Sequence, residues 1–595
     1  MLVLLQLLLS GIVASAQFVT PPDDLIETIG HAGVPVRYKE VPAGICELDP
    51  NVKSFSGYAD VAEGQHIFWW FFEARNGDPK ELPVTVWING GPGSSSMTGL
   101  FAELGPCGVD YFGNVYNNPH SWTNASNMLF IDQPSQVGFS YSQPVSAYEK
   151  NGRITILPNN TCPGGHIGDP SNCGTYSNPD VTLTANSTLS AAPAFWKTLQ
   201  GFMDAFPQYA SNDFNIATES YGGHYGPAFS AYIERQNDLN ITGTKRIPLK
   251  TLLVGNGWFD PLIQYQAFYN FTVSPGNTYD YFPYNASIEA LLYDNTHGTG
   301  NCLDQLKDCK MRGLNSVCAA ADDFCMAQVE DIYHNILGRD VYDIRELDPD
   351  PFPYKFFVNY LNTAEVQKAI GAYTNFSTYS NTVHQAFSST GDDARQVNAM
   401  EDIRFLLGRN ITVGLYAGDA DFDCNWIGGE AVAEEVSAPG FDQAGYTDLQ
   451  TSDGTVHGQV KQSGRFSFTR IYESGHMVPF YQPLAALEIF ERAIKGLDIE
   501  SGLQEASGPY VTTGSSRSIY REGSATLQWE AISKPTTYNV TTNRPGESWL
   551  QAVGAPTRPM DADYFKQYPF QHSGLGEDGN TWQLLIQYLL YLFSS

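Results

Sequence analysis

The chain has 595 residues, of which 42% are hydrophobic and 13% aromatic, so it can bury one large core or two modest ones. Its 33 basic and 64 acidic residues give a formal net charge of -31 at pH 7. This charge repels nucleic acid and anionic membrane surfaces, so neither is expected as a partner. The acidity favours solubility, and it also fits work at mildly acid pH, where part of the charge is neutralised.

Residues 1–16 form an apolar run that ends in Ala14-Ser15-Ala16, the small-x-small pattern of a signal-peptidase site. The run is too short to span a bilayer, so we predict a signal peptide that is removed after residue 16. Nine N-x-S/T sequons support passage through an oxidising compartment, and each is expected at the surface if it carries a glycan. They lie at Asn124, Asn159, Asn186, Asn240, Asn270, Asn285, Asn375, Asn410 and Asn539. The sequence therefore predicts a secreted or extracellular protein, with the vacuole as the less favoured location.

Nine cysteines in a secreted chain indicate up to four disulfides and one unpaired thiol. Four of them crowd residues 302–325 with no histidines at zinc-finger spacing, which favours bridges over a metal. We predict nested pairing there, and a local bridge elsewhere. The predicted pairs are Cys302 with Cys325, Cys309 with Cys318, and Cys162 with Cys173.

The hydrophobic pattern predicts strands that alternate with helices. Residues 18–78 indicate an antiparallel lead-in with an aromatic-rich strand over 66–72, and further strands are expected over 82–88, 127–131, 213–218, 249–254, 411–416 and 466–472. Helices are expected from about residue 189, after residue 221, and from about 482 to 495. This alternation is typical of an α/β protein with a mostly parallel central sheet and helices on both faces. The tyrosine- and cysteine-rich residues of about 260–362 are expected to form an inserted cap over the carboxyl edge of the sheet.

Ser220 lies at a predicted corner between a strand and a helix. The strand over 213–218 leads into the corner, after which Tyr225, Phe229 and Ile233 recur at helical spacing. A serine at such a corner is a nucleophile elbow, which lifts the side-chain oxygen clear of the sheet edge. Thr218 stands where the G-x-S-x-G pattern has its first glycine, and its bulk is expected to crowd the neighbouring strand. Taken alone, a small-residue turn of this kind is also a common plain connection.

A glycine-rich loop, residues 89–96, follows the strand over 82–88. The loop lacks a Gly-Lys-Ser/Thr ending and a G-x-G-x-x-G pattern, so nucleotide binding is not predicted. In an enzyme with a serine elbow, a backbone N-H of such a loop faces the oxyanion that develops during the reaction, which requires glycine for close approach.

Ser220, Asp421 and His476 each follow directly after a predicted strand. Their order along the chain is that of the α/β-hydrolases and differs from the chymotrypsin and subtilisin orders. In this arrangement His476 takes the serine proton, while Asp421 fixes the imidazole tautomer and stabilises the imidazolium. Asp419 is the nearest rival for the aspartate role. Taken singly, Asp421 also fits a turn residue and His476 a structural histidine.

Seven sequence blocks between Trp87 and Phe480 resemble those of the serine carboxypeptidases, and secreted fungal members are the most similar. The blocks are W-I-N-G-G-P-G-S-S-S, F-A-E-L-G-P, D-Q-P-S-Q-V-G-F-S-Y-S, T-E-S-Y-G-G-H-Y, G-N-G-W-F-D-P, A-G-D-A-D-F-D-C-N-W and G-H-M-V-P-F. The resemblance implies an α/β-hydrolase fold over residues 17–500. It also implies release of C-terminal amino acids from peptides or proteins through an acyl-enzyme, without a cofactor or a metal.

The resemblance further implies roles for individual residues. Ser220, Asp421 and His476 would be catalytic, and the backbone of Gly91 and Tyr221 would supply the oxyanion donors. The substrate would be bound by Asn89, Gly90, Glu103, Glu219 and Met477, with the substrate's terminal carboxylate on Asn89, Glu103 and Glu219. Two glutamates would repel that carboxylate unless at least one proton is shared, so we expect tighter peptide binding at acid than at neutral pH. The alternative is that Glu103 caps a loop and Glu219 faces solvent.

Three positions near these blocks depart from the family pattern or stand out. Ser94 replaces the cysteine that many relatives have in the glycine-rich loop, so one disulfide of the family is expected to be absent or rearranged. Asp423 stands in a usually apolar place, which favours a basic side chain before the scissile bond. Cys424 corresponds to the family's unpaired thiol, with a plain core cysteine as the alternative.

Beyond about residue 497 the resemblance fades. Residues 501–575 are rich in Ser, Thr, Pro and Gly and are predicted to be a C-terminal extension, partly packed against the domain or partly flexible. The apolar tail over 576–595 is too short to span a membrane. Because small residues and a polar spacer precede it, the tail resembles a GPI signal, and a short docking helix is an equal alternative.

Two other kinds of function stay open from the sequence. An acyltransferase or esterase of the same fold would keep the triad but change the carboxylate-binding residues, and a non-catalytic adhesion protein would lack a triad member. Neither change is present, so the sequence favours a peptidase whose partners are peptides or proteins with a free C-terminus. Membrane attachment is expected only through a GPI anchor, and the sequence indicates no oligomeric state.

Overall fold

The computed structural model describes residues 18–529, except 159–161, 163–171, 211, 274–275, 349, 351, 396–397 and 507, and adds two short strands at 538–539 and 544–545. The predicted signal peptide, the sequon at Asn159 and the apolar tail over 576–595 lie outside the described residues. Within the described part, no helix combines the length and the apolar character needed to cross a membrane.

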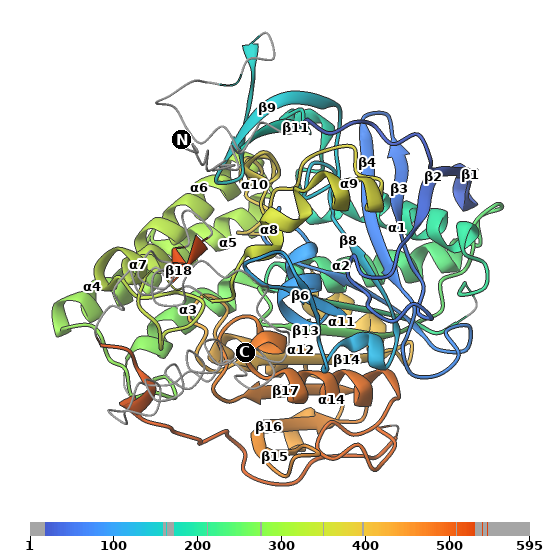
Figure 1. Ribbon diagram of the computed structural model, residues 1–595. Coiled ribbons are helices and arrows are strands. Elements are labelled where there is room, and N and C mark those ends of the chain that lie inside the picture. The colour runs from blue at the N-terminus through green and yellow to red at the C-terminus, as the bar shows by residue number, and fades with distance from the viewer. Residues whose placement is uncertain are drawn as a thin grey trace, which may run out of the picture.

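A twelve-stranded sheet runs through the molecule in the order β1-β2-β3-β4-β8-β5-β12-β13-β14-β17-β16-β15 (Figure 1). The six central strands, β8 to β17 in this order, pair in parallel, and the pairs at both ends are antiparallel. This arrangement confirms the predicted α/β fold and its antiparallel lead-in. The strands are β1 (Ile26–Ile29), β2 (Pro35–Val41), β3 (Ser54–Ala62), β4 (Gln65–Phe72), β5 (Val84–Ile88), β8 (Asn127–Ile131), β12 (Phe214–Glu219), β13 (Leu249–Gly255), β14 (Thr412–Gly418), β15 (Thr447–Gln450), β16 (Val456–Ser463) and β17 (Phe466–Ile471).

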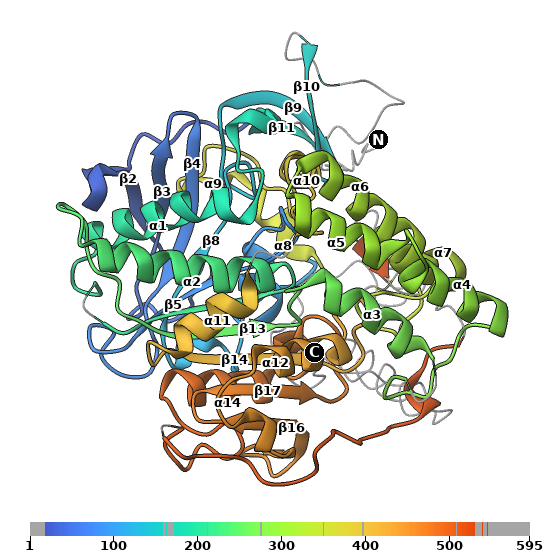
Figure 2. The same cartoon turned by 180° about the vertical axis from the view of Figure 1, so that it is seen from behind.

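Both faces of the sheet are buried, which explains the continuous hydrophobic runs of its strands. In β4, Trp69 and Phe71 belong to one core cluster, whereas Phe68, Trp70 and Phe72 belong to the other. One face is covered by α1 (Thr188–Ala205), α2 (Gly222–Leu239), α11 (Ala399–Leu407) and α12 (Trp426–Val436), as Figure 2 shows. The other face is covered by α8 (Phe356–Leu361), α9 (Ala364–Ile370) and α14 (Pro483–Ile494).

Several strands lie outside the segments that the sequence predicts. β9 (Pro144–Lys150), β10 (Arg153–Ile156) and β11 (Cys173–Ser177) form a separate three-stranded sheet, and β16 and β15 extend the main sheet beyond β17. β15 lacks the apolar alternation that predicts a strand, and in β10 the alternation is confined to Ile154 and Ile156, neither of which is buried.

The chain between β13 and β14 is mainly helical. It begins with α3 (Pro261–Thr272), α4 (Ala286–His297), α5 (Cys302–Arg312), α6 (Asn315–Cys325), η7 (Met326–Glu330) and α7 (Asp331–Leu337). Helices α4 to α7 lie together beside the sheet (Figure 1). This part of the chain includes the predicted cap, about residues 260–362, whose boundaries stay a prediction.

The four disulfides are Cys46–Cys107, Cys162–Cys173, Cys302–Cys325 and Cys309–Cys318, and Cys424 is free and buried. The nested pair and the local bridge are therefore confirmed, as is the expected odd thiol. No partner is predicted from the sequence for Cys46 or Cys107.

One sequon is not at the surface. Asn375 is 5% exposed; its Nδ2 donates to Asn362 Oδ1 at 3.2 Å and its Oδ1 accepts from Thr175 N at 2.8 Å. A glycan is therefore not expected at this site, because the nitrogen that would carry it is already engaged inside the fold. The sequon asparagines Asn186, Asn240, Asn270, Asn285 and Asn410 are exposed.

Candidate active site

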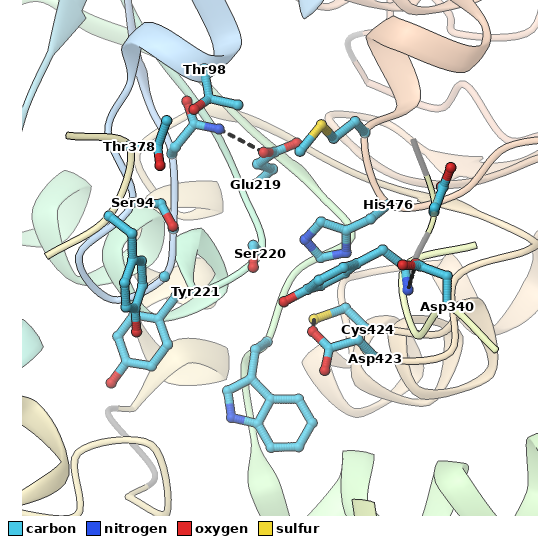
Figure 3. A pocket seen from close by; sticks show the side chains of 18 of the residues that line it. Ser94, Thr98, Glu219, Ser220, Tyr221, Asp340, Thr378, Asp423, Cys424 and His476 are labelled. Atoms are coloured by element: carbon cyan, nitrogen blue, oxygen red, sulfur yellow. Dashed lines mark hydrogen bonds between the residues drawn. The ribbon is translucent and has the colours of Figure 1, made fainter. Parts of the chain in front are cut away.

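Four loops that carry predicted site residues meet at the carboxyl edge of the parallel strands. Asn89 follows β5, Ser220 follows β12, Asp421 follows β14 and His476 follows β17. Because parallel strands end on the same edge of a sheet, these loops converge. A cavity of about 620 Å³ lies at this edge, and Asn89, Ser220 and His476 are among its lining residues (Figure 3).

Ser220 has the backbone geometry of a nucleophile elbow. β12 ends at Glu219 and α2 begins at Gly222, so the predicted strand–helix corner is confirmed. The φ of Ser220 is +63°, a left-handed conformation that is uncommon for a residue with a side chain. Backbone hydrogen bonds hold the corner: Ser220 N donates to Gly255 O at 3.0 Å, and Trp258 N donates to Ser220 O at 2.8 Å.

Thr218 is accommodated without crowding the neighbouring strand. Its Oγ1 donates to Ile88 O on β5 at 2.6 Å. A Cβ on Gly222 would lie 2.0 Å from this oxygen, so the missing side chain of Gly222 makes room for the threonine. The expected steric conflict is therefore wrong, because the absence of a side chain at Gly222 leaves space for the threonine side chain on the strand.

Asp421 and His476 form a buried pair. His476 Nδ1 lies 2.7 Å from Asp421 Oδ2, and the same oxygen accepts from Asn256 Nδ2 at 2.7 Å. This contact directs Nε2 of the ring away from Asp421, and Figure 3 shows the side chain of Ser220 beside the imidazole. Asp419, the rival, instead accepts from Tyr279 Oη at 2.8 Å, so the geometry favours Asp421.

The carboxyls around His476 control its charge. Burial lowers the pKa of His476, but the charge and hydrogen bond of Asp421, together with the charges of Glu219 and Asp423, raise it to about 9. A general base has to be neutral to accept a proton. Protonation of Glu219 or Asp423 removes part of the rise in the pKa of His476, and thereby favours the neutral ring.

The glycine-rich loop packs against the Ser220 corner. A Cβ on Gly90 would lie 2.4 Å from Tyr221 N, and Gly91 has a φ of +114°, so both positions require glycine. Gly91 and Tyr221, the predicted oxyanion donors, both line the cavity. Asp132 anchors the far end of the loop, where its Oδ1 accepts from Ser95 Oγ at 2.6 Å and Ser96 N at 2.9 Å.

Asn89, Glu103 and Glu219 form one buried cluster. Asn89 Nδ2 donates to Glu219 Oε1 at 2.7 Å and lies 3.5 Å from Glu103 Oε1, while Asn89 Oδ1 accepts from Trp87 Nε1 at 2.8 Å. Burial, and then the charge of Glu219, raise the pKa of Glu103 well above its usual range. Burial also raises the pKa of Glu219. One carboxyl of this pair therefore keeps a proton at a pH where an exposed glutamate has lost it.

These residues contribute to the cavity in different ways. Asn89, Gly90, Glu219 and Met477 line it directly. Glu103 is 5% exposed and lies behind Asn89, at the end of the turn η2 (Gly99–Glu103). The alternative in which Glu219 faces solvent is excluded, because Glu219 is 3% exposed.

A second acidic group, which the sequence only partly indicates, lines the opposite side of the cavity. Asp423 is joined there by Glu330 and Asp393. Burial and the charge of Asp421 raise the pKa of Asp423 to about 6, and burial raises the pKa values of Glu330 and Asp393 well above their usual range. Figure 3 shows Glu219 and Asp423 on opposite sides of Ser220 and His476. No motif surrounds Glu330 or Asp393, so no sequence signal assigns them to the site.

Asp421, Cys424 and His476 bring potential metal-ligand atoms within 4.8 Å of one another. Burial, followed by the charges of Asp423 and Asp421, raises the pKa of the Cys424 thiol well above its usual range. Metals bind the thiolate, and the hydrogen bond to Asp421 already occupies His476 Nδ1. These three side chains therefore fit a catalytic pair with a neutral thiol beside it better than a metal centre.

The sheet order, the strained serine corner and the Asp–His pair at the carboxyl edge define the α/β-hydrolase class of proteins. Residues 44–496 match the family described as serine carboxypeptidase. The chain belongs to this serine carboxypeptidase family, and it is a serine-type carboxypeptidase acting on peptides.

Named relatives agree with this assignment. The chain is 40% identical over 471 residues to carboxypeptidase S1 of Penicillium janthinellum, covering 77% of this chain and 99% of the relative. It is 38% identical over 545 residues to carboxypeptidase S1 homolog B of Arthroderma otae, covering 84% and 82%. A crystal structure of Kex1(delta)p, a prohormone-processing carboxypeptidase from Saccharomyces cerevisiae, shares the fold with a TM-score of 0.59 at 22% identity, covering 76% of this chain and 94% of that one.

The buried carboxyls predict greater stability at acid pH. Burial raises the pKa of Asp132 to about 6, and burial with nearby carboxylates raises that of Asp322 to about 7. Because these pKa values are higher in the folded than in the unfolded chain, the folded chain binds more protons between about pH 4 and pH 7. The free energy of unfolding should therefore increase as the pH falls through this window, and we expect Tm to be at least about 3 °C higher at pH 5 than at pH 7.5.

The variant Asp322→Asn tests whether buried carboxyls cause the expected rise in Tm at acid pH. Within the described part of the chain Asp322 Oδ1 has no hydrogen-bond partner, so Asp322→Asn imitates the protonated carboxyl without breaking a bond at that oxygen. This variant should show a smaller Tm difference between the two pH values, mainly through a higher Tm at pH 7.5. A wild-type Tm that is higher at pH 7.5 would contradict the argument.

Proposed function

We propose that Ser220 is the nucleophile, His476 the general base and acid, and Asp421 the group that orients the imidazole. In the first step, Ser220 Oγ attacks the scissile carbonyl carbon while His476 Nε2 takes the hydroxyl proton. The carbonyl oxygen becomes an oxyanion that faces the backbone N-H groups of Gly91 and Tyr221. His476 then gives the proton to the departing amino acid, and water hydrolyses the acyl-enzyme by the same route. The observation that carries this proposal is the 2.7 Å contact of His476 with Asp421 beside the strained Ser220 corner.

We also propose that the cluster of Asn89, Glu103 and Glu219 binds the free carboxylate of the peptide. The cluster lies close to the Ser220 corner, since Glu219 precedes it directly. A proton shared by the two glutamates turns one of them into a hydrogen-bond donor, as does the amide of Asn89. Binding of a carboxylate at this position explains why cleavage would remove the last residue of the chain rather than an internal one. The need for a shared proton supports work at acid pH.

Blocked dipeptides with a free or an amidated C-terminus test this proposal. An amidated substrate offers the same scissile bond but no terminal carboxylate, so we expect kcat/KM to be lower by about 100-fold or more. Hydrolysis of the matching ester substrate measures whether the triad works independently of carboxylate binding. Equal rates on free and amidated peptides would overturn the carboxylate site, and activity on esters alone would favour the esterase alternative.

The acidic group around Asp423 supports a preference for a basic side chain before the scissile bond. Asp423 lies across the cavity from Glu219, next to Glu330 and Asp393, so an ammonium or guanidinium group would neutralise buried carboxylates. Because the pKa of Asp423 is about 6, this preference should be strongest near neutral pH.

Substrates that differ only at this position measure the preference. At pH 7, a peptide with lysine before the scissile bond should have a kcat/KM roughly tenfold above that of the norleucine peptide, which has the same chain length without the charge. We expect the ratio to fall at pH 4.5, where Asp423 is protonated, and the variant Asp423→Asn to lower the ratio at pH 7 but to change it little at pH 4.5. A ratio that does not respond to this substitution would contradict the role of Asp423.

We propose that the protein is exported from the cell. Four disulfides and five exposed sequon asparagines support passage through an oxidising compartment. The predicted GPI attachment depends on residues 576–595 and is separate from secretion. Release of the protein from cell surfaces by a GPI-specific phospholipase would support the anchor, and full recovery in the medium without this enzyme would oppose it.

A further inference from the structure

Residues 497–529 wrap around the domain beyond the end of the family match at residue 496. Figure 1 shows this segment, drawn in orange and red, leaving α14, passing below β15 and β16 and continuing toward the helices that follow β13. Residues 510–529 of this segment are called the C-terminal clamp below. Their contacts fall into three groups along the path.

The first contacts attach the clamp to the edge of the sheet. Val511 forms a bridge with Ser463 at the end of β16, and Ser515 forms a bridge with Tyr446 beside β15. Thr512 Oγ1 accepts from Gln462 N at 2.9 Å. This part of the clamp lies outside the loops that carry the active-site residues.

The second contacts converge on Arg470 of β17. Its guanidinium donates to Ser518 Oγ at 2.8 Å and to Tyr520 O at 3.0 Å, and it also donates to Thr278 Oγ1 at 2.7 Å. Arg470 is 1% exposed and lies 3.8 Å from Asp419, so the clamp supplies hydrogen-bond acceptors to a buried charge that also has a carboxylate beside it. β17 leads directly to the loop that carries His476.

The third contacts join the clamp to residues 339–347, which follow α7. Gln528 N donates to Arg345 O at 2.7 Å, and Gln528 Oε1 accepts from Leu347 N at 2.9 Å. Arg339 Nη2 donates to Gln528 O at 2.6 Å. Gln528 therefore forms hydrogen bonds with both ends of this segment, Arg339 and Leu347, and with Arg345 between them.

Residues 339–347 in turn hold both loops of the proposed Asp–His pair. Val341 O accepts from Phe422 N at 2.9 Å and from Asp423 N at 3.1 Å, on the two residues that follow Asp421. Tyr342 O accepts from His476 N at 2.8 Å. The Tyr342 ring also lies against the His476 ring, with a centroid separation of 4.8 Å.

The close packing leaves little freedom for this segment to move without moving His476. A Cβ on Gly475 would lie 2.4 Å from Tyr342 O and 3.0 Å from Asp343 Cβ. Residues 339–347 lie outside helices and named strands, so their position depends on contacts with other parts of the chain. Those contacts include the two active-site loops on one side and Gln528 on the other, and the guanidinium groups of Arg339 and Arg345 also lie over tyrosine rings.

We propose that Gln528, near the end of the C-terminal clamp, sets the relative position of the Asp421 and His476 loops and is a positioning residue for peptide cleavage, whereas the contacts at the sheet edge only attach the clamp to the domain. The proposal rests on the catalytic roles proposed above for Asp421 and His476. Catalysis is sensitive to small displacements of the base from the nucleophile, whereas substrate binding depends mainly on the Asn89 cluster on another part of the cavity wall. Loosening the clamp should therefore lower kcat more than it changes KM.

Three variants of the full chain test the clamp. Gln528→Ala removes the oxygen that accepts from Leu347 N, and Gln528→Glu keeps an accepting oxygen at that position. Thr512→Val is the matched control, because it removes a hydrogen bond of the same extension at the sheet edge and far along the chain from Gln528. For each variant, kcat, KM, Tm and the rate of inactivation by an organophosphate that reacts with Ser220 are measured.

We expect Gln528→Ala to lower kcat and the inactivation rate by roughly three- to tenfold, with KM changed less than twofold. Gln528→Glu should restore most of kcat. Thr512→Val should keep the wild-type kcat and inactivation rate at a temperature well below its Tm.

Two results would overturn the proposal that the clamp positions the active-site loops. If Gln528→Ala lowers Tm but keeps the wild-type kcat, as Thr512→Val should, the extension is only structural. If Ser220→Ala stays active, the proposed catalytic site is wrong, and the clamp is overturned with it. Loss of activity in Ser220→Ala together with a normal kcat in Gln528→Ala overturns the clamp alone.

Discussion

Replacing Ser220 by alanine is expected to lower kcat for a blocked dipeptide by about 10⁴-fold or more. The variant lacks the oxygen that attacks the carbonyl, and the left-handed corner is held by backbone hydrogen bonds that alanine keeps. KM should change little, because the Asn89 cluster is intact. Steady-state kinetics at saturating peptide, with Tm as a check of folding, measure the effect.

Ser230→Ala is the matched control. Ser230 is buried on the same helix, α2, and its Oγ has no hydrogen-bond partner among the residues that the structure describes, so its loss should leave kcat unchanged. His476→Ala should be as inactive as Ser220→Ala, and the double variant should be no worse than either single one, because the residues act as a unit. Release of C-terminal amino acids at an undiminished rate by Ser220→Ala would disprove the role of this serine.

The second large effect is expected in the pH dependence of KM, and it comes from the buried pair Glu103 and Glu219. For the wild-type protein, KM for peptides with a free C-terminus should rise by about tenfold between pH 4.5 and pH 7.5, because the shared proton is lost and two carboxylates then face a third. Both glutamates have raised pKa values, so the rise in KM should begin above the pH at which an exposed glutamate ionises. KM measured across this range, with an amidated peptide for comparison, reports the change.

Glu219→Gln should flatten this profile, since an amide donates a hydrogen bond at every pH. Glu430→Gln is the control, because Glu430 is another carboxyl with a pKa raised by burial, but it bonds to Tyr446 and does not line the cavity. A wild-type KM that is constant from pH 4.5 to pH 7.5 would count against proton sharing.

The same substitution should also move the pH dependence of kcat. The charge of Glu219 contributes to the raised pKa of His476, so its removal lowers that pKa. The imidazole is then neutral at lower pH, and the acid limb of the kcat profile should shift toward acid. The proposed carboxylate site and the proposed base are thus electrostatically coupled. Protonation of Glu219 at acid pH favours peptide binding and also lowers the pKa of His476, which limits the loss of neutral imidazole as the pH falls.

Much of the fold follows from local pattern. The apolar runs of β5, β8, β12 and β13 predict these strands to within two residues, because strands buried on both faces leave continuous hydrophobic segments. The same criterion does not predict β10 and β15, because neighbouring strands rather than buried side chains stabilise them. Thr218 shows a different limit: its fit depends on Gly222, four residues later at the start of α2, and this compensation becomes evident only in three dimensions.

The sequence by itself determined the class of fold, the serine corner and the order of Ser220, Asp421 and His476, and its resemblance to the serine carboxypeptidases implied the residues of the Asn89 cluster. These features lie in short contiguous blocks, and the direction of parallel strands brings the blocks to one edge. Only the tertiary structure decided that Asp421 rather than Asp419 reaches His476, that Glu330 and Asp393 join Asp423, and that Gln528 supports the active-site loops. The physical reason is that hydrogen bonding and proton affinity depend on distance and burial in space, and residues far apart along the chain carry no local pattern that records their contact.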